Sequence, residues 1–183
     1  MATGTREDVV DLLLKQHDEI RSLLDTVERS SGERRKQKFD ELRRLLAVHE
    51  TAEEEVVHPY ARRKLGGDDA VDELVDEERK GKEVLKRLEK VETGSPDFLP
   101  LFRELRTSIE AHARHEEESE FPQLRIKGST DELTGMATLV KAAESVAPTH
   151  PHPGVEGQAK NLALGPMAAV VDRTRDAIHK ARS

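Results

Sequence analysis

The stretch HETAEEEVVHP, residues 49–59, returns in altered form as HARHEEESEFP at residues 112–122. In both copies a glutamate follows the first histidine after four residues, and a proline follows it after ten. At about 100° per residue, this histidine and glutamate fall on one face of a helix. The same faces carry apolar residues, namely Leu42, Leu45 and Val56 in the first copy and Leu101, Leu105 and Ile109 in the second. Both faces should therefore pack against other helices.

Four polar side chains lie within these apolar faces: His49, Glu53, His112 and Glu116. Burying such groups without a partner costs several kcal/mol. Two explanations are open, a network of hydrogen-bonded side chains or a bound metal ion. Because the pattern occurs twice, solvated surface charge does not explain it.

The composition favours a bundle of long, solvated helices. The chain has 183 residues, enough for one domain with a core, with 37% charged and only 3% aromatic residues. A net charge of −7 gives no electrostatic reason to bind nucleic acid, and the lack of cysteine excludes disulfides, thiolate ligands and iron–sulfur clusters. No apolar run approaches the ~18 residues of a membrane span. The N-terminus shows no apolar signal segment, so a cytoplasmic location is expected.

Periodicity and turn residues predict four helices within residues 1–130. The expected bounds are Thr5 (as N-cap) to about Ser30, Glu33 to Leu65 with a kink at Pro59, Asp69 to Glu92, and Ser95 to about Lys127. The first and third helices align so that His17 corresponds to Glu78. Two such hairpins joined by short loops predict an all-α, up-down-up-down four-helix bundle.

Residues 131–183 form a C-terminal helical extension that packs on the bundle in this interpretation. A short helix is expected from Asp131 to Ala147 and a final helix from Met167 to Ala181, packed on the outside of the bundle. The proline-rich segment 148–166 connects them. It contains His150 and His152, for which turn roles and a contribution to the metal site both stay open.

Six side chains would converge inside the bundle, three imidazoles and three carboxylates: His17, His49, Glu53, Glu78, His112 and Glu116. This mixture of donors suits iron, manganese or zinc, and a carboxylate can bridge two cations. Six ligands for two metals would leave open positions, as a reactive site requires.

Other polar residues of the two motifs are assigned outside this set. Three residues near the site are candidates of second rank: Glu50, Tyr60 and His115. His58 falls 180° from His49 on a regular helix and is expected to be exposed. A solvated face is expected for Glu54, Glu55, Glu117 and Glu118.

With these residues the sequence resembles the hemerythrin-like proteins of the HHE cation-binding class, over about residues 8–127. The matching residues are His17, the His49/Glu53 pair and the His112/Glu116 pair, on four consecutive helices. The resemblance implies a non-haem centre of two iron ions, oxo- or hydroxo-bridged, that meets dioxygen, peroxide or nitric oxide. Relatives carry or sense dioxygen, sense iron or decompose peroxide.

Two departures from the oxygen-carrying hemerythrins shape the functional hypothesis. Those proteins have two histidines one turn apart on the third helix, where this chain has Glu78 and Lys82, and an aspartate where it has Glu117. Both changes argue against reversible oxygen carriage. The expected function is peroxide decomposition, as in a catalase, or dioxygen binding. The alternative is an iron-binding or iron- or oxygen-sensing module without turnover.

Two further classes are less favoured. A ferritin-like oxidase would need Glu-x-x-His twice. The chain has it once, as Glu55 and His58, with His58 expected off the core face. A purely structural bundle conflicts with the repeated polar residues on the buried faces.

Overall fold

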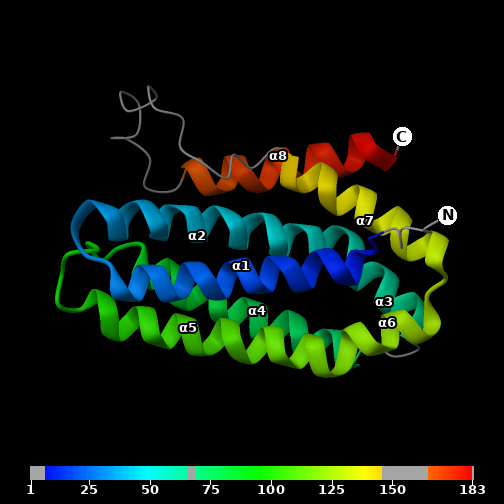
Figure 1. Ribbon diagram of the computed structural model, residues 1–183, viewed down its shortest axis with the longest axis horizontal. Coiled ribbons are helices and arrows are strands. Elements are labelled where there is room, and N and C mark those ends of the chain that lie inside the picture. Colours follow the sequence, from blue (N-terminus) through cyan, green and yellow to red (C-terminus); the bar gives the residue numbers. More distant parts are fainter. Residues whose placement is uncertain (1–6, 66–68, 146–164, 183) are drawn as a thin grey trace, which may run out of the picture.

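The computed structural model describes residues 7–65, 69–145 and 165–182, and every element in these ranges is helical. Thr5, His150, His152 and most of the proline-rich segment lie outside the described residues. The elements in chain order are α1 (Val9–Arg29), α2 (Gly32–Ala52), η1 (Glu53–Val57), α3 (His58–Leu65), α4 (Asp69–Leu88), α5 (Phe98–His115), η2 (Glu116–Glu120), α6 (Phe121–Lys127), α7 (Thr130–Ser145) and α8 (Gly165–Arg182). Helices α1, α2, α4 and α5 run side by side along the long axis (Figure 1). The predicted all-α bundle is confirmed.

Helix α1 begins later than predicted, because its N-terminus is closed by a reciprocal pair of aspartates. The Asp8 side chain accepts a hydrogen bond from the backbone N–H of Asp11 (2.9 Å), and the Asp11 side chain accepts one from Asp8 (3.1 Å). This arrangement satisfies two N–H groups that the helix itself leaves free. The predicted cap at Thr5 was therefore wrong. Helix α4 also ends at Leu88 instead of Glu92, and α5 begins at Phe98 instead of Ser95.

Both sequence motifs contain the same helical irregularity, a five-residue π-helical turn. The backbone N–H of His58 bonds to the carbonyl of Glu53, and that of Phe121 bonds to the carbonyl of Glu116. A proline stands two residues after the end of each turn, at Pro59 and at Pro122. Proline has no N–H to donate, which disfavours the regular ladder there. The irregularity predicted at Pro59 is present, one turn earlier than the proline itself.

The apolar core is divided into two clusters, and the polar residues lie between them. One cluster includes Leu13 of α1 and Val48 of α2, and the other includes Ile20 of α1 and Leu46 of α2. His17 comes between Leu13 and Ile20 in the sequence of α1. The fold thus places a polar layer across the middle of the bundle.

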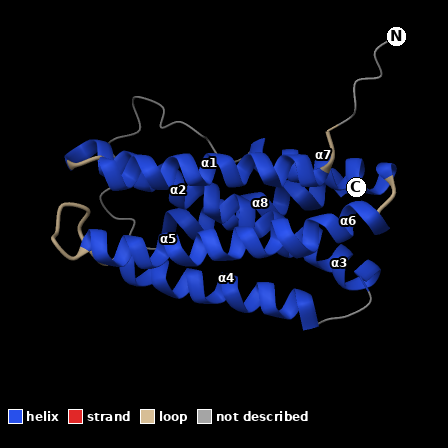
Figure 2. Cartoon of the chain, turned by 60° about the horizontal axis from the view of Figure 1, so that its bottom comes forward, coloured by secondary structure: helices blue, strands red, loops and turns tan. Residues whose placement is uncertain are grey.

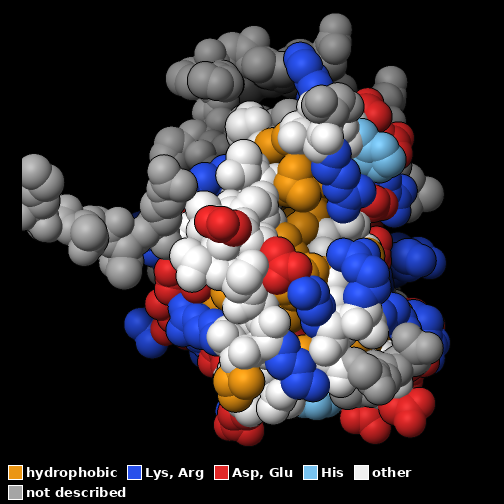
Figure 3. Space-filling model, turned by 90° about the vertical axis from the view of Figure 1, so that its right-hand side faces the viewer, with side chains coloured by type: hydrophobic (Ala, Val, Ile, Leu, Met, Phe, Trp, Pro, Cys, Tyr) orange, Lys and Arg blue, Asp and Glu red, His pale blue; other side chains and the backbone are white. Residues whose placement is uncertain are grey.

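The C-terminal helices cover one side of this bundle. Helix α8 packs on α2, and α7 packs on α1 (Figures 1 and 2). Val140 of α7 and Val170 and Ile178 of α8 are buried in the same cluster as Leu13. Figure 3 shows the end where α3, α6 and α7 meet, with hydrophobic side chains in a narrow strip between charged ones. None of the described helices is long and apolar enough to cross a membrane.

Candidate metal site

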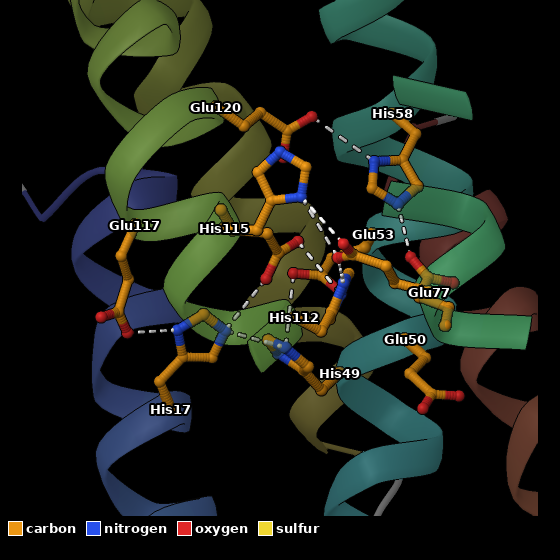
Figure 4. Close-up of polar contacts among 12 residues, drawn as sticks. His17, His49, Glu50, Glu53, His58, Glu77, His112, His115, Glu117 and Glu120 are labelled. Carbon is orange, nitrogen blue, oxygen red and sulfur yellow. Dashed lines mark hydrogen bonds and ion pairs between the residues drawn. The ribbon is translucent and has the colours of Figure 1, made fainter. Parts of the chain in front are cut away.

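The first group of potential ligands joins both hairpins. It contains His17 of α1, His49 of α2, Glu53 of η1 and Glu116 of η2, all buried, with one ligand atom of each within 4.8 Å of the others (Figure 4). Nε2 of His17 lies 3.2 Å from Nε2 of His49 and 3.2 Å from Oε2 of Glu116. Nε2 of His49 lies 3.3 Å from Oε1 of Glu53. Two nitrogen ligands that each lie about 2.1 Å from one ion are at most about 4.2 Å apart, so these distances fit a shared cation.

A second group lies beside the first and shares Glu53 with it. Its other members are His58 of α3 and Glu78 of α4, both buried. Nε2 of His58 lies 2.6 Å from Oε1 of Glu78, and its Nδ1 lies 3.5 Å from Oε1 of Glu120. Glu53 is therefore the one carboxylate within reach of two adjacent cation positions in the described part of the chain.

Several buried atoms at this site have no hydrogen-bond partner among the described residues. They are both carboxylate oxygens of Glu53, Glu116 and Glu120, Nδ1 of His58 and Nε2 of His112. A buried polar atom left unsatisfied costs about 1–3 kcal/mol, and more when it is charged. All of these atoms can donate an electron pair to a cation such as iron, manganese or zinc. The side chains present thus fit a bound metal.

In three of the histidines, Nδ1 contacts a polar side chain on the side away from the site, which leaves Nε2 facing the site. The partners are Glu117 for His17 (2.7 Å), Gln16 for His49 (2.7 Å) and Glu77 for His112 (3.3 Å). Such outer contacts fix the tautomer and the ring orientation of metal-binding histidines. Glu117 was expected in a solvated face. That prediction was wrong, because its carboxylate also accepts from Arg21 (2.8 Å) and stays largely covered.

The first group combines neutral imidazole with carboxylate when no cation is present. Burial and the neighbouring His17 lower the pKa of His49 to about 3, so its ring is uncharged at neutral pH. Burial alone would raise the pKa of Glu116, but the facing imidazoles of His17 and His112 outweigh it and lower the pKa to about 2. This half of the site presents a lone pair and a negative charge to a cation.

The second group contains a charged imidazole when no cation is present, unlike His49 of the first group. Burial lowers the pKa of His58, but the carboxylates of Glu120 and Glu78 outweigh it and raise the pKa to about 10. Burial and the nearby carboxylates of Glu116 and Glu78 hold the pKa of Glu53 well above its usual range. Without a cation, this half is an imidazolium ion among crowded carboxyl groups.

The structure brings all six side chains of the predicted ligand set together. His17, His49, Glu53 and Glu116 form the first group, and Glu78 belongs to the second. His112 borders the first group, with Nε2 3.5 Å from Oε1 of Glu116.

The three candidates of second rank lie apart from both groups. Glu50 pairs with Lys82 (3.4 Å). The hydroxyl of Tyr60 donates to Glu132 (2.9 Å), and Nδ1 of His115 contacts Glu77 (3.1 Å).

Two residues of the site were not predicted, His58 and Glu120. His58 was expected to be exposed, and that was wrong, because only 4% of its side chain is accessible. The extra residue of the π-helical turn rotates everything after it by about 100°, and this brings His58 from the far side of the helix toward the interior. The repeated proline ten residues after His49 and His112 was the signal that could have revealed this turn.

A small cavity of about 30 Å³ borders the site between α1, α2, α4 and α5. Its lining contains His17, His49, Glu78 and His112 together with apolar residues that include Leu85, Leu105 and Ile109. Gly81 lies in its wall, where a Cβ atom would approach the Ser108 hydroxyl to 3.4 Å. The candidate ligands thus border a confined, mainly apolar space.

Comparison with known proteins identifies a family that the chain resembles. The model of the hemerythrin HHE cation binding domain matches residues 8–124. An uncharacterised hemerythrin-like protein of Schizosaccharomyces pombe is 30% identical over 138 residues, which cover 74% of this chain and 68% of that protein. A protein of Nostoc sp. named as a DNA nickase is 29% identical over 139 residues, which cover 75% of this chain but only 39% of that protein.

The fold has a counterpart among solved structures. A hemerythrin HHE cation binding domain-containing protein from Mycobacterium kansasii superposes with a TM-score of 0.69 at 21% identity, over 91% of this chain and 98% of that one. This likeness concerns the fold. Together with the family match, it shows that the chain belongs to the hemerythrin HHE cation-binding family, whose members bind metal cations.

Proposed function

We propose that this protein binds two iron ions in adjacent positions and decomposes hydrogen peroxide. The observation that carries the proposal is the membership of Glu53 in both groups of potential ligands. A carboxylate with two free oxygens between two sets of donors is suited to bridge two cations. His17, His49 and Glu116 would hold the first ion, and His58 and Glu78 the second, with His112 and Glu120 beside them.

The donor set supports iron as the metal. Imidazole and carboxylate ligands suit iron, and the chain has no cysteine to provide the thiolates that other sites use. The four carboxylates Glu53, Glu78, Glu116 and Glu120 are all buried at the site. Hard anionic oxygen donors favour the ferric state, so we expect a mainly ferric resting form.

The size of the cavity supports a small oxygen species as substrate. A cavity of about 30 Å³ has room for roughly two water molecules. Hydrogen peroxide, dioxygen and nitric oxide have two heavy atoms each, whereas an alkyl hydroperoxide is larger. The side chains of Leu105 and Ile109 make part of the cavity wall apolar, and Gly81 leaves the space that another side chain would fill.

Disproportionation of peroxide consumes and releases the same number of electrons and protons. One molecule gains two electrons and two protons and becomes two waters, while the other loses two electrons and two protons and becomes dioxygen. A pair of iron ions would store the two electrons between these half-reactions. Glu77 lines the cavity, contacts Nδ1 of both His112 and His115, and is 35% exposed. It is therefore placed to exchange protons between solvent and the cavity.

The presence of Lys82 favours peroxide turnover over reversible binding of dioxygen. In the oxygen-carrying relatives this position of the third helix has a histidine, whereas Nζ of Lys82 lies 3.4 Å from Oε2 of Glu78. An ammonium group cannot bind a cation, so it cannot complete a histidine-rich set of ligands. Its charge instead offsets that of the carboxylate that replaces the other histidine.

The experiment uses the full chain loaded with iron under anaerobic conditions. Metal analysis should give two iron ions per chain. The near-ultraviolet spectrum, in a chain with no tryptophan and one tyrosine, should show charge-transfer bands of iron clearly. After reduction and exposure to dioxygen, we expect fast oxidation without a stable oxygenated form, and release of dioxygen from added peroxide. Repeated reversible binding of dioxygen without peroxide turnover would refute the proposal.

A matched pair of histidines tests the ligand assignment. His112 directs Nε2 toward Glu116, whereas its neighbour His115 contacts Glu77 only and is 31% exposed. His49→Ala and His112→Ala should each lose at least one iron, and His115→Ala should keep both. If His49→Ala and His112→Ala retain two ions, the assignment is wrong.

The second candidate function is an iron-binding or sensing module without turnover. The direct contact between His58 and Glu78 favours it, because these groups satisfy each other when no cation is bound. Binding of the second ion would have to break this pair, so occupancy could report the iron level. Two bound ions with no release of dioxygen from peroxide would select this function.

A further inference from the structure

The extension outside the family match reaches the site through one buried glutamine. Gln16 of α1 is 3% exposed, and its Nε2 donates a hydrogen bond to Oε1 of Glu144 on α7 (2.6 Å). Its Oε1 accepts a hydrogen bond from Nδ1 of His49 (2.7 Å). A continuous chain of hydrogen bonds therefore runs from α7 to a predicted metal ligand.

The chemistry of Glu144 gives this chain of hydrogen bonds a direction. An ionised carboxylate can only accept, so the NH₂ group of Gln16 must face it and the amide oxygen must face His49. The imidazole nitrogen opposite that oxygen must then carry the proton. Nε2 of His49 is left with a free lone pair, 3.2 Å from Nε2 of His17 and 3.3 Å from Oε1 of Glu53. This is the tautomer that binds a cation at Nε2.

We propose that Glu144 is a positioning residue for the cation site, which acts through Gln16 to hold His49 in its metal-binding tautomer. Nδ1 of His17 and Nδ1 of His112 each contact a carboxylate directly, that of Glu117 and that of Glu77. His49 is linked to a carboxylate through the side chain of Gln16. That carboxylate belongs to α7, beyond the matched residues 8–124. The extension thus contributes to metal affinity as well as to packing. The inference rests on the proposed function only in taking His49 as a ligand.

The experiment removes the fixed direction of the hydrogen bonds between Glu144, Gln16 and His49 and then restores it. In Glu144→Gln, residue 144 can donate as well as accept, so the orientation of Gln16 is no longer fixed. In the double variant Gln16→Glu with Glu144→Gln, the new carboxylate accepts from His49 and the new amide donates to that carboxylate, which restores the direction. Asp131→Asn, on the exposed surface of the same helix, is the matched control.

Two readouts are used, and neither depends on catalytic turnover. In the cation-free protein, ¹⁵N imidazole spectra should show His49 protonated at Nδ1 in the wild type, the control and the double variant, and a mixture of tautomers in Glu144→Gln. Titration with Co²⁺, and with Fe²⁺ under anaerobic conditions, should show about tenfold weaker binding in Glu144→Gln alone. The melting temperature of the cation-free form should change little, which separates positioning from a loss of folding.

Two results would overturn the inference. One is a Glu144→Gln variant that keeps both the wild-type tautomer and an affinity within twofold. The other is a double variant that remains as weak as Glu144→Gln, because the direction of the hydrogen bonds would then be irrelevant. Failure of the proposed function is recognised separately, since His49→Ala would then retain full metal content. The tautomers of the cation-free protein would still test the role of Glu144.

Discussion

The two hairpins share one backbone design but place different chemistry at equivalent positions. His17 of α1 corresponds to Glu78 of α4, and His58, the residue that follows η1, corresponds to Phe121, which follows η2. Phe121 stacks on His17 with ring centroids 5.5 Å apart, and Nε2 of His58 lies 2.6 Å from Oε1 of Glu78. In each case the residue after the π-helical turn contacts the first helix of the other hairpin.

This difference teaches that the duplication fixes where side chains meet, while substitutions decide what each meeting place can bind. One contact joins an aromatic ring to an imidazole, which leaves His17 free to bind a cation at Nε2. The other joins His58 to Glu78 and adds Glu120, so the second candidate cation position combines a charged imidazole with more carboxyl groups. The two positions should therefore differ in affinity and in their response to pH.

The largest expected effect separates the two glutamates of the motifs. Glu53 belongs to both groups and Glu116 to one, so Glu53→Ala should lose both cations while Glu116→Ala should keep one. Metal content after dialysis against a weak chelator measures this. In the cation-free state, Glu53→Ala should melt above the wild type, because it removes a buried carboxyl group without hydrogen bonds. Equal losses in the two variants would show that Glu53 is no bridge.

The next effect comes from making the first hairpin resemble the second. His58→Phe introduces the residue that the second copy has at this position, and it removes the imidazole of the second group. We expect one cation per chain, held by His17, His49 and their carboxylates, and loss of peroxide turnover. Metal analysis and an oxygen electrode provide the measurements. A variant with two ions and normal turnover would remove His58 from the site.

The stability of the cation-free protein should depend on pH because of this asymmetry. The folded pKa of His58, about 10, lies above its ordinary 6.5. The folded state therefore keeps a proton that the unfolded state loses, and this contribution to stability is complete below about pH 6.5 and disappears as the pH rises toward 10. The raised pKa of Glu53 acts in the same direction above its ordinary 4.5. His49, with its pKa lowered to about 3, acts in the opposite direction, but only below about pH 6.5.

The unfolding free energy of the cation-free form should therefore fall between pH 6.5 and 10, by at most about 1.4 kcal/mol per pH unit for each group. Urea denaturation at several pH values measures it. In the metal-bound protein the ligands are deprotonated by the cation, so the slope should be small and the melting temperature at pH 7 higher. His58→Phe should make the cation-free profile less steep, because the contribution of His58 is removed while that of Glu53 remains. A flat profile in the cation-free wild type would contradict the raised pKa values.

The smallest effect concerns the cavity. Gly81 of α4 corresponds to Ile20 of α1, which is buried in the core, so only the second hairpin leaves space at this position. Gly81→Ala should stabilise α4 by about 0.5–1 kcal/mol through helix propensity and leave metal content unchanged. The added methyl group should narrow the cavity and slow peroxide turnover a few-fold. Turnover at the wild-type rate would mean that substrate reaches the site by another route.

The bundle and most of the site could be predicted from the sequence because they depend on periodicity. Helical spacing placed His49 on one face with Glu53 and His112 on one face with Glu116. The alignment of the two hairpins placed Glu78 at the position that corresponds to His17. These relations hold for any regular helix, and the structure brings all six side chains together.

The missed residues depend on departures from that regularity or on contacts between distant segments. A wheel of constant pitch puts His58 outside, and only the π-helical turn brings it in. The contact of Glu144 with Gln16 joins residues 128 positions apart, and no local pattern reveals such a pair. Glu117 was misjudged for a similar reason, since its partners His17 and Arg21 lie on another helix.

The π-helical turns separate the number of residues in these segments from the direction of the side chains that follow. Each turn accommodates one inserted residue, so deleting a single residue between Glu54 and Val57 would restore a regular helix and leave His58 facing the interior. A deletion between Glu117 and Glu120 would likewise leave Phe121 in its present direction. When hemerythrin-like sequences are aligned, a gap of one position here should be read as the loss of the π-helical turn, with the residues that follow kept in the same direction.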